Sequence, residues 1–480
     1  MPDREKKLDA LLKTQGLMTG AEWARKREAQ PEQPPEDDGQ DAEKTQPPSP
    51  TPTETVRTLT QRLGLMTGSQ YVHHREEVEA QREAGDFEID QVVDGKVVGD
   101  DEAGFFLVRR DFPLDYQQGI VTLGAALASS SKHIAFSAAD PGLEDFDPRT
   151  TLFIDTETTG LAGGAGTVAF LVGVGYFIED AFRLDQCFLR DYDDEAPMLD
   201  FLAERFADHD TVVGYNSKSF DLPLLRTRFI QNRVPFRLDA ILHYDLVHAA
   251  RRFWKRRLSD CSLGNIEREV LGIHRQGDVP SYLIPQLWLD YLDTRDARPL
   301  EGVLYHHRMD ILSLVSLTAW LSQCLDAPAG DGFAHVEDRL SLVRLHFKQR
   351  QYEAVIQHGD AFLEAEDRGP LRRECLEMMG IAYKRLQRWP DMQAAFERLL
   401  DEFPGDITAC LELAKHHEHR TRNLLEAERL CTRLLDRAEI TLALDHGATP
   451  LSAQAQTLRR RLDRIRRKLS KGRPRTIDPE

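Results

Sequence analysis

Four carboxylates in three separate segments are the residues of this sequence best suited to chemistry: Asp155 and Glu157, Asp221, and Asp310. The first pair ends an apolar, strand-like run at 151–160. Because residues i and i+2 of a strand face the same side, both acids are expected to project together. Adjacent carboxylates repel unless a cation compensates them, and oxygen-only ligands favour Mg²⁺ or Mn²⁺ over zinc. The pattern predicts a two-ion site that cleaves phosphodiester bonds.

The second segment, Val213-Gly-Tyr-Asn-Ser-Lys-Ser-Phe-Asp221, reads as a strand that ends near Tyr215 and a helix that follows. Asn216 or Ser217 could cap this helix. Asp221 would then lie about one turn inside it, near the positive end that favours an anion and its metal. An acid in a first turn also complements the helix dipole without any chemistry. This segment therefore needs the other two to define a site.

The third segment, Leu304-Tyr-His-His-Arg-Met-Asp310, is expected to be helical. His306 and Asp310 stand at i and i+4 and so share a helix face, which His307 could join. A neutral imidazole beside the metal site could position or deprotonate a water molecule, because its pKa lies near the working pH. A plain surface His–Asp pair is the alternative explanation of this spacing.

Taken in order, the three segments resemble the DEDD exonuclease superfamily, which has an RNase H-like fold. Its motifs are similar to Asp-x-Glu-Thr-Thr-Gly at 155–160, to Asn216 with Phe220-Asp221, and to the segment ending in Asp310. The block 261–267 and Asp278-Val-Pro resemble the YprB-type group of these proteins. The resemblance covers about residues 100–325.

The resemblance implies metal-dependent removal of nucleotides in the 3′-to-5′ direction, with two Mg²⁺ or Mn²⁺ ions about 4 Å apart. Asp155 would bridge both ions, Glu157 and Asp310 would complete one site, and Asp221 would serve the other. The superfamily has a tyrosine four residues before the last aspartate or a histidine five before it. In this sequence His306 stands four residues before Asp310 and Tyr305 stands five before it, the reverse of both patterns, although His306 resembles the YprB-type group. We therefore expect His306 to act as the base, with His307 and Tyr305 as alternatives.

Nucleic acid is the expected partner, although the formal net charge of −18 opposes phosphate binding. The glycine-rich stretch 160–166 lacks the Gly-Lys-Ser/Thr of a phosphate loop and is expected to form a turn beside the terminal nucleotide. The run 251–257 holds five cations and two aromatics, which could bind phosphates and stack bases. The same run could instead be a helix whose aromatics pack inward. The nucleic-acid contacts expected are Thr158, Gly160, Asn216, Phe220, Arg252, Lys255 and Arg256.

The organisation of the chain predicts an α/β domain with an RNase H-like mixed sheet flanked by helices at 99–328. Residues 1–98 are expected to form a tail with two short Gly-Leu-Met-Thr-Gly helical modules, at 16–20 and 64–68, joined by a disordered Pro/Glu-rich linker. Residues 335–440 carry tetratricopeptide-like spacing, for which a protein partner is expected. Residues 441–480 form a basic helix and tail, with ten Lys or Arg against Asp463 in 459–475. This helix could bind nucleic acid or simply be solvated.

The composition is that of a globular protein, with 41% hydrophobic and 30% charged residues. No apolar run approaches the roughly 20 residues that span a bilayer, and no Cys-x-x-Cys pair is present, so no membrane contact and a cytoplasmic location are expected. A non-catalytic scaffold that binds nucleic acid or protein is the alternative function, and a polymerase proofreading subunit would share the chemistry. The sequence does not distinguish DNA from RNA, and the exonucleolytic direction comes from the resemblance alone.

Overall fold

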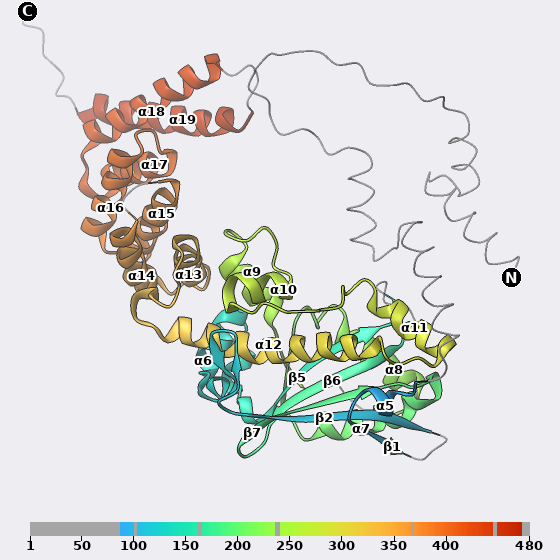
Figure 1. Ribbon diagram of the computed structural model, residues 1–480. Helices are drawn as coiled ribbons and strands as arrows, with labels where there is room; N and C mark the ends of the chain where they lie inside the picture. Colours follow the sequence, from blue (N-terminus) through green and yellow to red (C-terminus); the bar gives the residue numbers. More distant parts are fainter. Residues whose placement is uncertain are drawn as a thin grey trace, which may run out of the picture. The chain divides into compact units, whose positions relative to one another are not determined.

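A computed structural model of the chain describes residues 87–99, 103–160, 166–235, 241–366, 369–444 and 449–472. The two Gly-Leu-Met-Thr-Gly modules and their linker lie outside the described residues, as do 161–165 of the glycine-rich stretch and 473–475 of the basic tail. The described part contains a seven-stranded sheet with helices, followed by a helical region (Figure 1).

The sheet has the strand order β1-β2-β7-β6-β5-β8-β9. Neighbours from β1 to β5 pair antiparallel, whereas β5, β8 and β9 run parallel. This mixed sheet with helices on its faces confirms the predicted fold class. The strands are β1 (Lys96–Gly99), β2 (Gly104–Pro113), β5 (Thr151–Thr158), β6 (Ala169–Phe177), β7 (Ala181–Phe188), β8 (Thr211–Gly214) and β9 (Leu242–Asp245), and a separate pair is formed by β3 (Gln117–Gln118) and β4 (Val121–Thr122).

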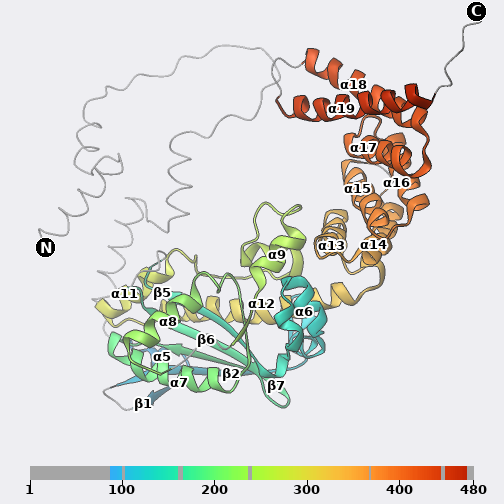
Figure 2. The same cartoon turned by 180° about the vertical axis from the view of Figure 1, so that it is seen from behind.

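The alternation of side chains along β5 separates the two faces of the sheet. Leu152 and Ile154 belong to the apolar cluster that includes residues of α7 (Glu195–Ala207) and α8 (Asp221–Gln231). Phe153 belongs to the cluster that contains the middle of α12 (Leu300–Asp326). Figures 1 and 2 show α12 along one face of the sheet and α7 and α8 on the other. Asp155 and Glu157 continue the Phe153 side and therefore face α12.

Two glycines of β6 allow α12 to lie against the sheet. A Cβ at Gly173 would come within 2.1 Å of Ile311 Cδ1 and 2.5 Å of His307 Cε1, and one at Gly175 within 2.9 Å of Ile311 Cγ2. Gly173 is also the β-sheet partner of Asp155. The missing side chains therefore create the space in which α12 brings its histidines to the end of β5.

The start of α8 differs from the prediction, because the helix begins at Asp221 rather than near Ser217. The carboxylate of Asp245, at the end of β9, accepts the backbone N–H groups of Asn216 at 2.7 Å and Lys218 at 3.0 Å. Asn216 is in the left-handed region, with φ of 63°. These bonds hold residues 215–220 as a turn, so Asp221 is the first helical residue. The short strand β9 was not recognised in the sequence, and neither was this anchor.

The remaining helices of the sheet-containing part are α5 (Ile89–Val92), α6 (Ser131–Ala138), α9 (Leu246–Trp254), α10 (Leu263–Ile266) and α11 (Ile284–Thr294). The helical region that follows consists of α13 (Val336–Lys348), α14 (Tyr352–Ala365), α15 (Pro370–Arg385), α16 (Trp389–Glu402), α17 (Ile407–His416), α18 (Leu424–Leu444) and α19 (Thr449–Gly472). Its members share one apolar cluster that runs from Leu340 to Ile465. In the described part of the chain, no helix has the length and apolar character needed to cross a membrane.

The basic helix α19 packs on this helical region instead of being merely solvated. Its residues Leu458, Leu462 and Ile465 are buried in the cluster. Its cations surround Glu418, whose side chain is fully buried: Arg461, Arg464 and Lys468 donate to that carboxylate at 2.7–2.8 Å. Burial raises the pKa of Glu418, but the hydrogen bonds from Arg464 and Lys468 outweigh it and hold the pKa at about 2.

Replacing Gly173 by alanine should destabilise the fold by about 1–3 kcal/mol, because the added methyl overpacks a region that cannot yield without moving α12. Urea unfolding monitored by circular dichroism measures the loss. The matched control is Gly264→Ala in α10, where an added Cβ meets nothing within 4 Å. Equal effects of the two variants would contradict the close approach.

Glu418→Gln should destabilise the helical region by roughly 2 kcal/mol at neutral pH, through lost charged hydrogen bonds. Because the folded pKa is depressed to about 2, this stability is present above the ordinary pKa near 4.5 and is lost as the pH falls toward 2. The difference in melting temperature between wild type and variant should therefore shrink on acidification. Glu428→Gln, which removes a single surface pair with Arg466, is the control. A pH-independent difference would disprove the ionic contribution.

Candidate active site

The structure brings the four predicted carboxylates together at the carboxyl end of β5. Asp155 Oδ2 lies 3.8 Å from His307 Nε2, and Glu157 Oε1 lies 3.9 Å from His306 Nε2. Asp310 comes from the next turn of α12, and its Oδ2 lies 3.5 Å from the same His306 nitrogen. Asp221 reaches the cluster from the other face of the sheet. The strand β5 and the helices α8 and α12 thus meet at one point.

Asp221 is fixed by the side chain that lies between the two strand acids in sequence. Thr156 Oγ1 donates a hydrogen bond of 2.6 Å to Asp221 Oδ1. Since Thr156 points to the α8 face while its neighbours point to α12, this bond ties the two halves of the cluster together. Pairing of β5 with β8 stops at Phe153, so the residues of β5 after Phe153 have no partner in β8.

The half-buried Asp155 and Glu157 and the buried Asp221 have raised pKa values. Burial, and then the charges of Asp310 and Asp221, raise the pKa of both Asp155 and Glu157 well above the ordinary range. Burial likewise raises the pKa of Asp221 to about 6, although the Thr156 hydrogen bond opposes it. A divalent cation would offset this repulsion, so the oxygen-rich donor set fits Mg²⁺ or Mn²⁺.

His307 has its ring nitrogens committed to structural hydrogen bonds. Gln186 Nε2 donates to its Nδ1 at 3.0 Å and to the carbonyl of Leu304 at 2.9 Å. The other ring nitrogen, Nε2, must then carry the proton and donates it to the backbone carbonyl of Asp155 at 3.0 Å. Burial lowers the pKa of His307 to about 4. This geometry makes His307 a neutral tether between α12 and β5 and leaves it no free lone pair to act as a base.

Tyr305, the other alternative base, is placed away from the acids. Its ring lies 5.2 Å from the guanidinium carbon of Arg308. It lines neither of the two cavities that contain the cluster. Of the three residues considered, His306 is the one that lines a cavity at the cluster.

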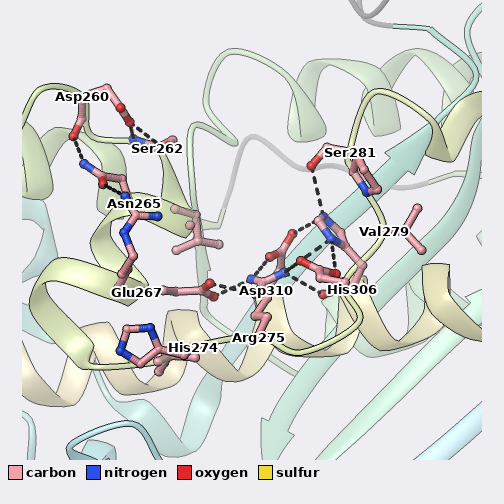
Figure 3. A pocket seen from close by; sticks show the side chains of 16 residues that line it. Asp260, Ser262, Asn265, Glu267, His274, Arg275, Val279, Ser281, His306 and Asp310 are labelled. Carbon is pink, nitrogen blue, oxygen red and sulfur yellow. Dashed lines mark hydrogen bonds and ion pairs between the residues drawn. The ribbon is translucent and has the colours of Figure 1, made fainter. Parts of the chain in front are cut away.

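His306 lies beside Asp310 and Ser281 (Figure 3). Asp278 Oδ1 lies 2.8 Å from its Nδ1 and accepts the proton of that nitrogen, so Nε2 is the ring atom that faces Glu157 and Asp310. Ser281 Oγ is 3.3 Å from Nε2. The side chain is 9% exposed.

Arg275 is a site residue that the motif reasoning missed. Its Nη2 donates to Asp310 Oδ1, and its Nε donates to Glu267 Oε2 at 2.7 Å, with a second bond to the other oxygen of Glu267. Burial lowers the pKa of Arg275, but the charges and hydrogen bonds of Asp310 and Glu267 outweigh it. The pKa is raised overall, so the guanidinium stays charged. Glu267 and Asp278 stand in the two blocks quoted for the family resemblance, which was the one signal that could have identified this network.

Two cavities meet at the carboxylate cluster. The first, of about 650 Å³, is lined by Asp155, Glu157 and Asp221. It also contains four of the predicted nucleic-acid contacts: Thr158, Gly160, Asn216 and Phe220. Phe220 is 54% exposed. The second cavity, of about 720 Å³ and shown in Figure 3, holds Glu267, Arg275, His306 and Asp310.

The basic run 251–257 lies outside both cavities and has protein partners. Phe253 and Trp254 are buried, so the base-stacking hypothesis for them is wrong: the amphipathic helix α9 packs both rings into the core. Arg252 donates to the carbonyl of Ser137, and Arg256 pairs with Glu374 in α15. Arg252 and Arg256 thus have protein partners that the sequence did not reveal, and their contact with nucleic acid stays a prediction. Lys255 is exposed, and its contact stays a prediction.

Comparison with known proteins agrees with this fold. Residues 152–322 match a family described as the RNase_H superfamily, and this part of the chain is an RNase H superfamily domain. The chain is also similar to the Bacillus subtilis (strain 168) protein named "Uncharacterized protein YprB": it is 29% identical over 383 residues, which are 77% of this chain and 87% of that protein. The resemblance predicted from the motifs is confirmed at this level.

Asp155→Asn should stabilise the metal-free protein at neutral pH, because it removes a charge from a crowded, buried cluster. A carboxyl whose folded pKa is raised loses stability as the pH rises from its ordinary pKa near 4 through the raised value. The melting temperature with EDTA at pH 7–8 should rise by roughly 2–4 °C, the shift expected for about 1 kcal/mol. The control is Asp111→Asn, which removes a surface pair with Arg183 and should not stabilise. A lower melting temperature for Asp155→Asn would contradict the raised pKa.

Proposed function

We propose that this protein is a metal-dependent nuclease, and specifically a 3′–5′ exonuclease acting on DNA or RNA. The observation that carries the proposal is the convergence of Asp155, Glu157, Asp221 and Asp310 from three distant segments. Such a cluster is costly in the absence of a cation, because burial and neighbouring charges raise the pKa values of Asp155, Glu157 and Asp221. An RNase H superfamily domain supplies the same class of chemistry, hydrolysis of phosphodiester bonds.

The four carboxylates would hold two Mg²⁺ or Mn²⁺ ions. When bound, such ions supply positive charge that stabilises the attacking and leaving oxygens of a phosphodiester. The residues of the chain orient these donors: Thr156 holds Asp221, Arg275 holds Asp310, and His307 holds α12 against the backbone of Asp155. His306 directs Nε2 at this place, where its neighbours are Glu157, Asp310 and the Ser281 hydroxyl.

The cavity of about 650 Å³ suits the end of a nucleic-acid strand. Its volume falls in the range of roughly 300–1,000 Å³ typical of small-molecule sites. Phe220, exposed at its rim, offers a face on which a base can stack. The backbone at Thr158 and Gly160 lines the same space and could lie close to the sugar-phosphate chain. A terminal nucleotide held here would place its phosphodiester bond at the carboxylates.

Purified protein should shorten a 5′-labelled oligonucleotide stepwise in Mn²⁺ or Mg²⁺. The assay compares single- and double-stranded DNA and RNA, so that the product ladder gives both polarity and substrate. Asp221→Asn should lower the rate at least about 100-fold, more than the 10–100-fold effect of losing an outer partner of a metal ligand. Asp180→Asn, an exposed acid in the turn between β6 and β7, is the matched control and should be fully active.

Two outcomes would overturn the proposal. One is that none of the four substrates is cleaved in either metal ion. The other is that Asp221→Asn cleaves as fast as wild type, which would trace the activity to a contaminant. Cleavage inside a circular single strand would keep the nuclease and reject the exonuclease.

A further inference from the structure

We propose that His306 is a metal ligand rather than the general base, and that Glu157, His306 and Asp310 form one ion centre that prefers Mn²⁺ to Mg²⁺. This inference deepens the proposed function and rests on it for the presence of ions. The family resemblance implies that the histidine of this segment orients or deprotonates the attacking water. The two roles exclude one another, because the one lone pair of Nε2 cannot bind an ion and accept a proton at the same time.

The spacing of the donor atoms supports the ligand role. His306 Nε2 lies 3.5 Å from Asp310 Oδ2 and 3.9 Å from Glu157 Oε1, and one ligand atom from each residue lies within 4.8 Å of the other two. Around an ion with bonds of about 2.1 Å, adjacent donors lie roughly 3 Å apart and opposite donors roughly 4.2 Å apart. The imidazole nitrogen therefore already stands at the separation expected within one coordination shell. A base would need room for a water molecule between itself and the ion.

Each of two donors has an outer partner that orients its ligand atom, and Ser281 Oγ, 3.3 Å from His306 Nε2, is the neighbour that an ion would displace. Asp278 accepts the proton of His306 Nδ1 and so presents Nε2. Arg275 binds Oδ1 of Asp310 and so presents Oδ2. Arg275 is itself held by Glu267. A carboxylate behind a histidine and a hydrogen bond behind a ligating carboxylate are the usual outer partners of protein metal sites.

The donor set predicts which ion is preferred. Carboxylates alone suit Mg²⁺ and Mn²⁺ about equally as ligand types, whereas an imidazole nitrogen favours first-row transition ions. Asp155 and Asp221, which face the other cavity, supply oxygen donors for the second ion. The two centres should therefore differ in selectivity, with the nitrogen-containing one as the Mn²⁺ centre.

Pulsed electron paramagnetic resonance of the full chain loaded with Mn²⁺ tests the proposal without using activity. We expect nitrogen hyperfine coupling in the wild type, its loss in His306→Gln, and its retention in His274→Gln, an exposed histidine of the same cavity. Calorimetric titration should show Mn²⁺ affinity about 10–100-fold lower in Asp278→Asn, as for other outer-partner changes. In His306→Gln the preference for Mn²⁺ over Mg²⁺ should fall at least about tenfold.

Wild-type protein that binds Mn²⁺ without nitrogen coupling would overturn the ligand role, and this result does not depend on any variant folding. Coupling that persists in His306→Gln would overturn it as well. The proposed function fails separately: a Mn²⁺ centre with nitrogen coupling but no cleavage of any oligonucleotide would keep the centre and reject the nuclease. Cleavage with no nitrogen coupling would do the reverse.

Discussion

Electrostatic repulsion among closely placed, partly buried carboxylates is the constraint on which the rest of this structure depends. Asp155, Glu157 and Asp221 have raised pKa values because burial and neighbouring charges act in the same direction. Only one arginine, Arg275, lies against the cluster within the described residues, and it is shared with Glu267. The repulsion lowers the free energy of unfolding. Other contacts in the fold, or the binding of a cation, must therefore offset this loss of stability.

The packing around the cluster shows where that stability comes from. Gly173 and Gly175 let α12 approach the sheet closely enough for His307 to bond the backbone of Asp155. Asp245 fixes the turn before α8 through backbone N–H groups, and Thr156 then holds Asp221. None of these contacts needs an ion. The protein can thus keep the acids within reach of one another before any metal is bound, which is the preorganisation that an active site requires.

The sequence was most informative where chemistry and periodicity coincide. The alternation in β5 placed Asp155 and Glu157 on one face, and the i, i+4 spacing placed His306 above Asp310, because both rules depend on local geometry alone. The start of α8 was missed because a tertiary bond from Asp245 replaces the expected cap. Arg275 and Asp278 were missed for a similar reason, since nothing in their local pattern points to residues about 30 positions away. The basic run 251–257 misled for its aromatics, because α9 packs Phe253 and Trp254 into the core, where no base can stack on them.

The central claim is that the carboxylate cluster is a site for divalent cations, and calorimetric titration with Mn²⁺ in buffers of different ionisation enthalpy tests it most directly. Because the pKa values of Asp155 and Glu157 are raised, binding at neutral pH should release protons to the buffer. The account predicts saturable binding with proton release in the wild type and loss of both in Asp155→Asn. Absence of saturable binding, or equal binding and proton release in the variant, would contradict it.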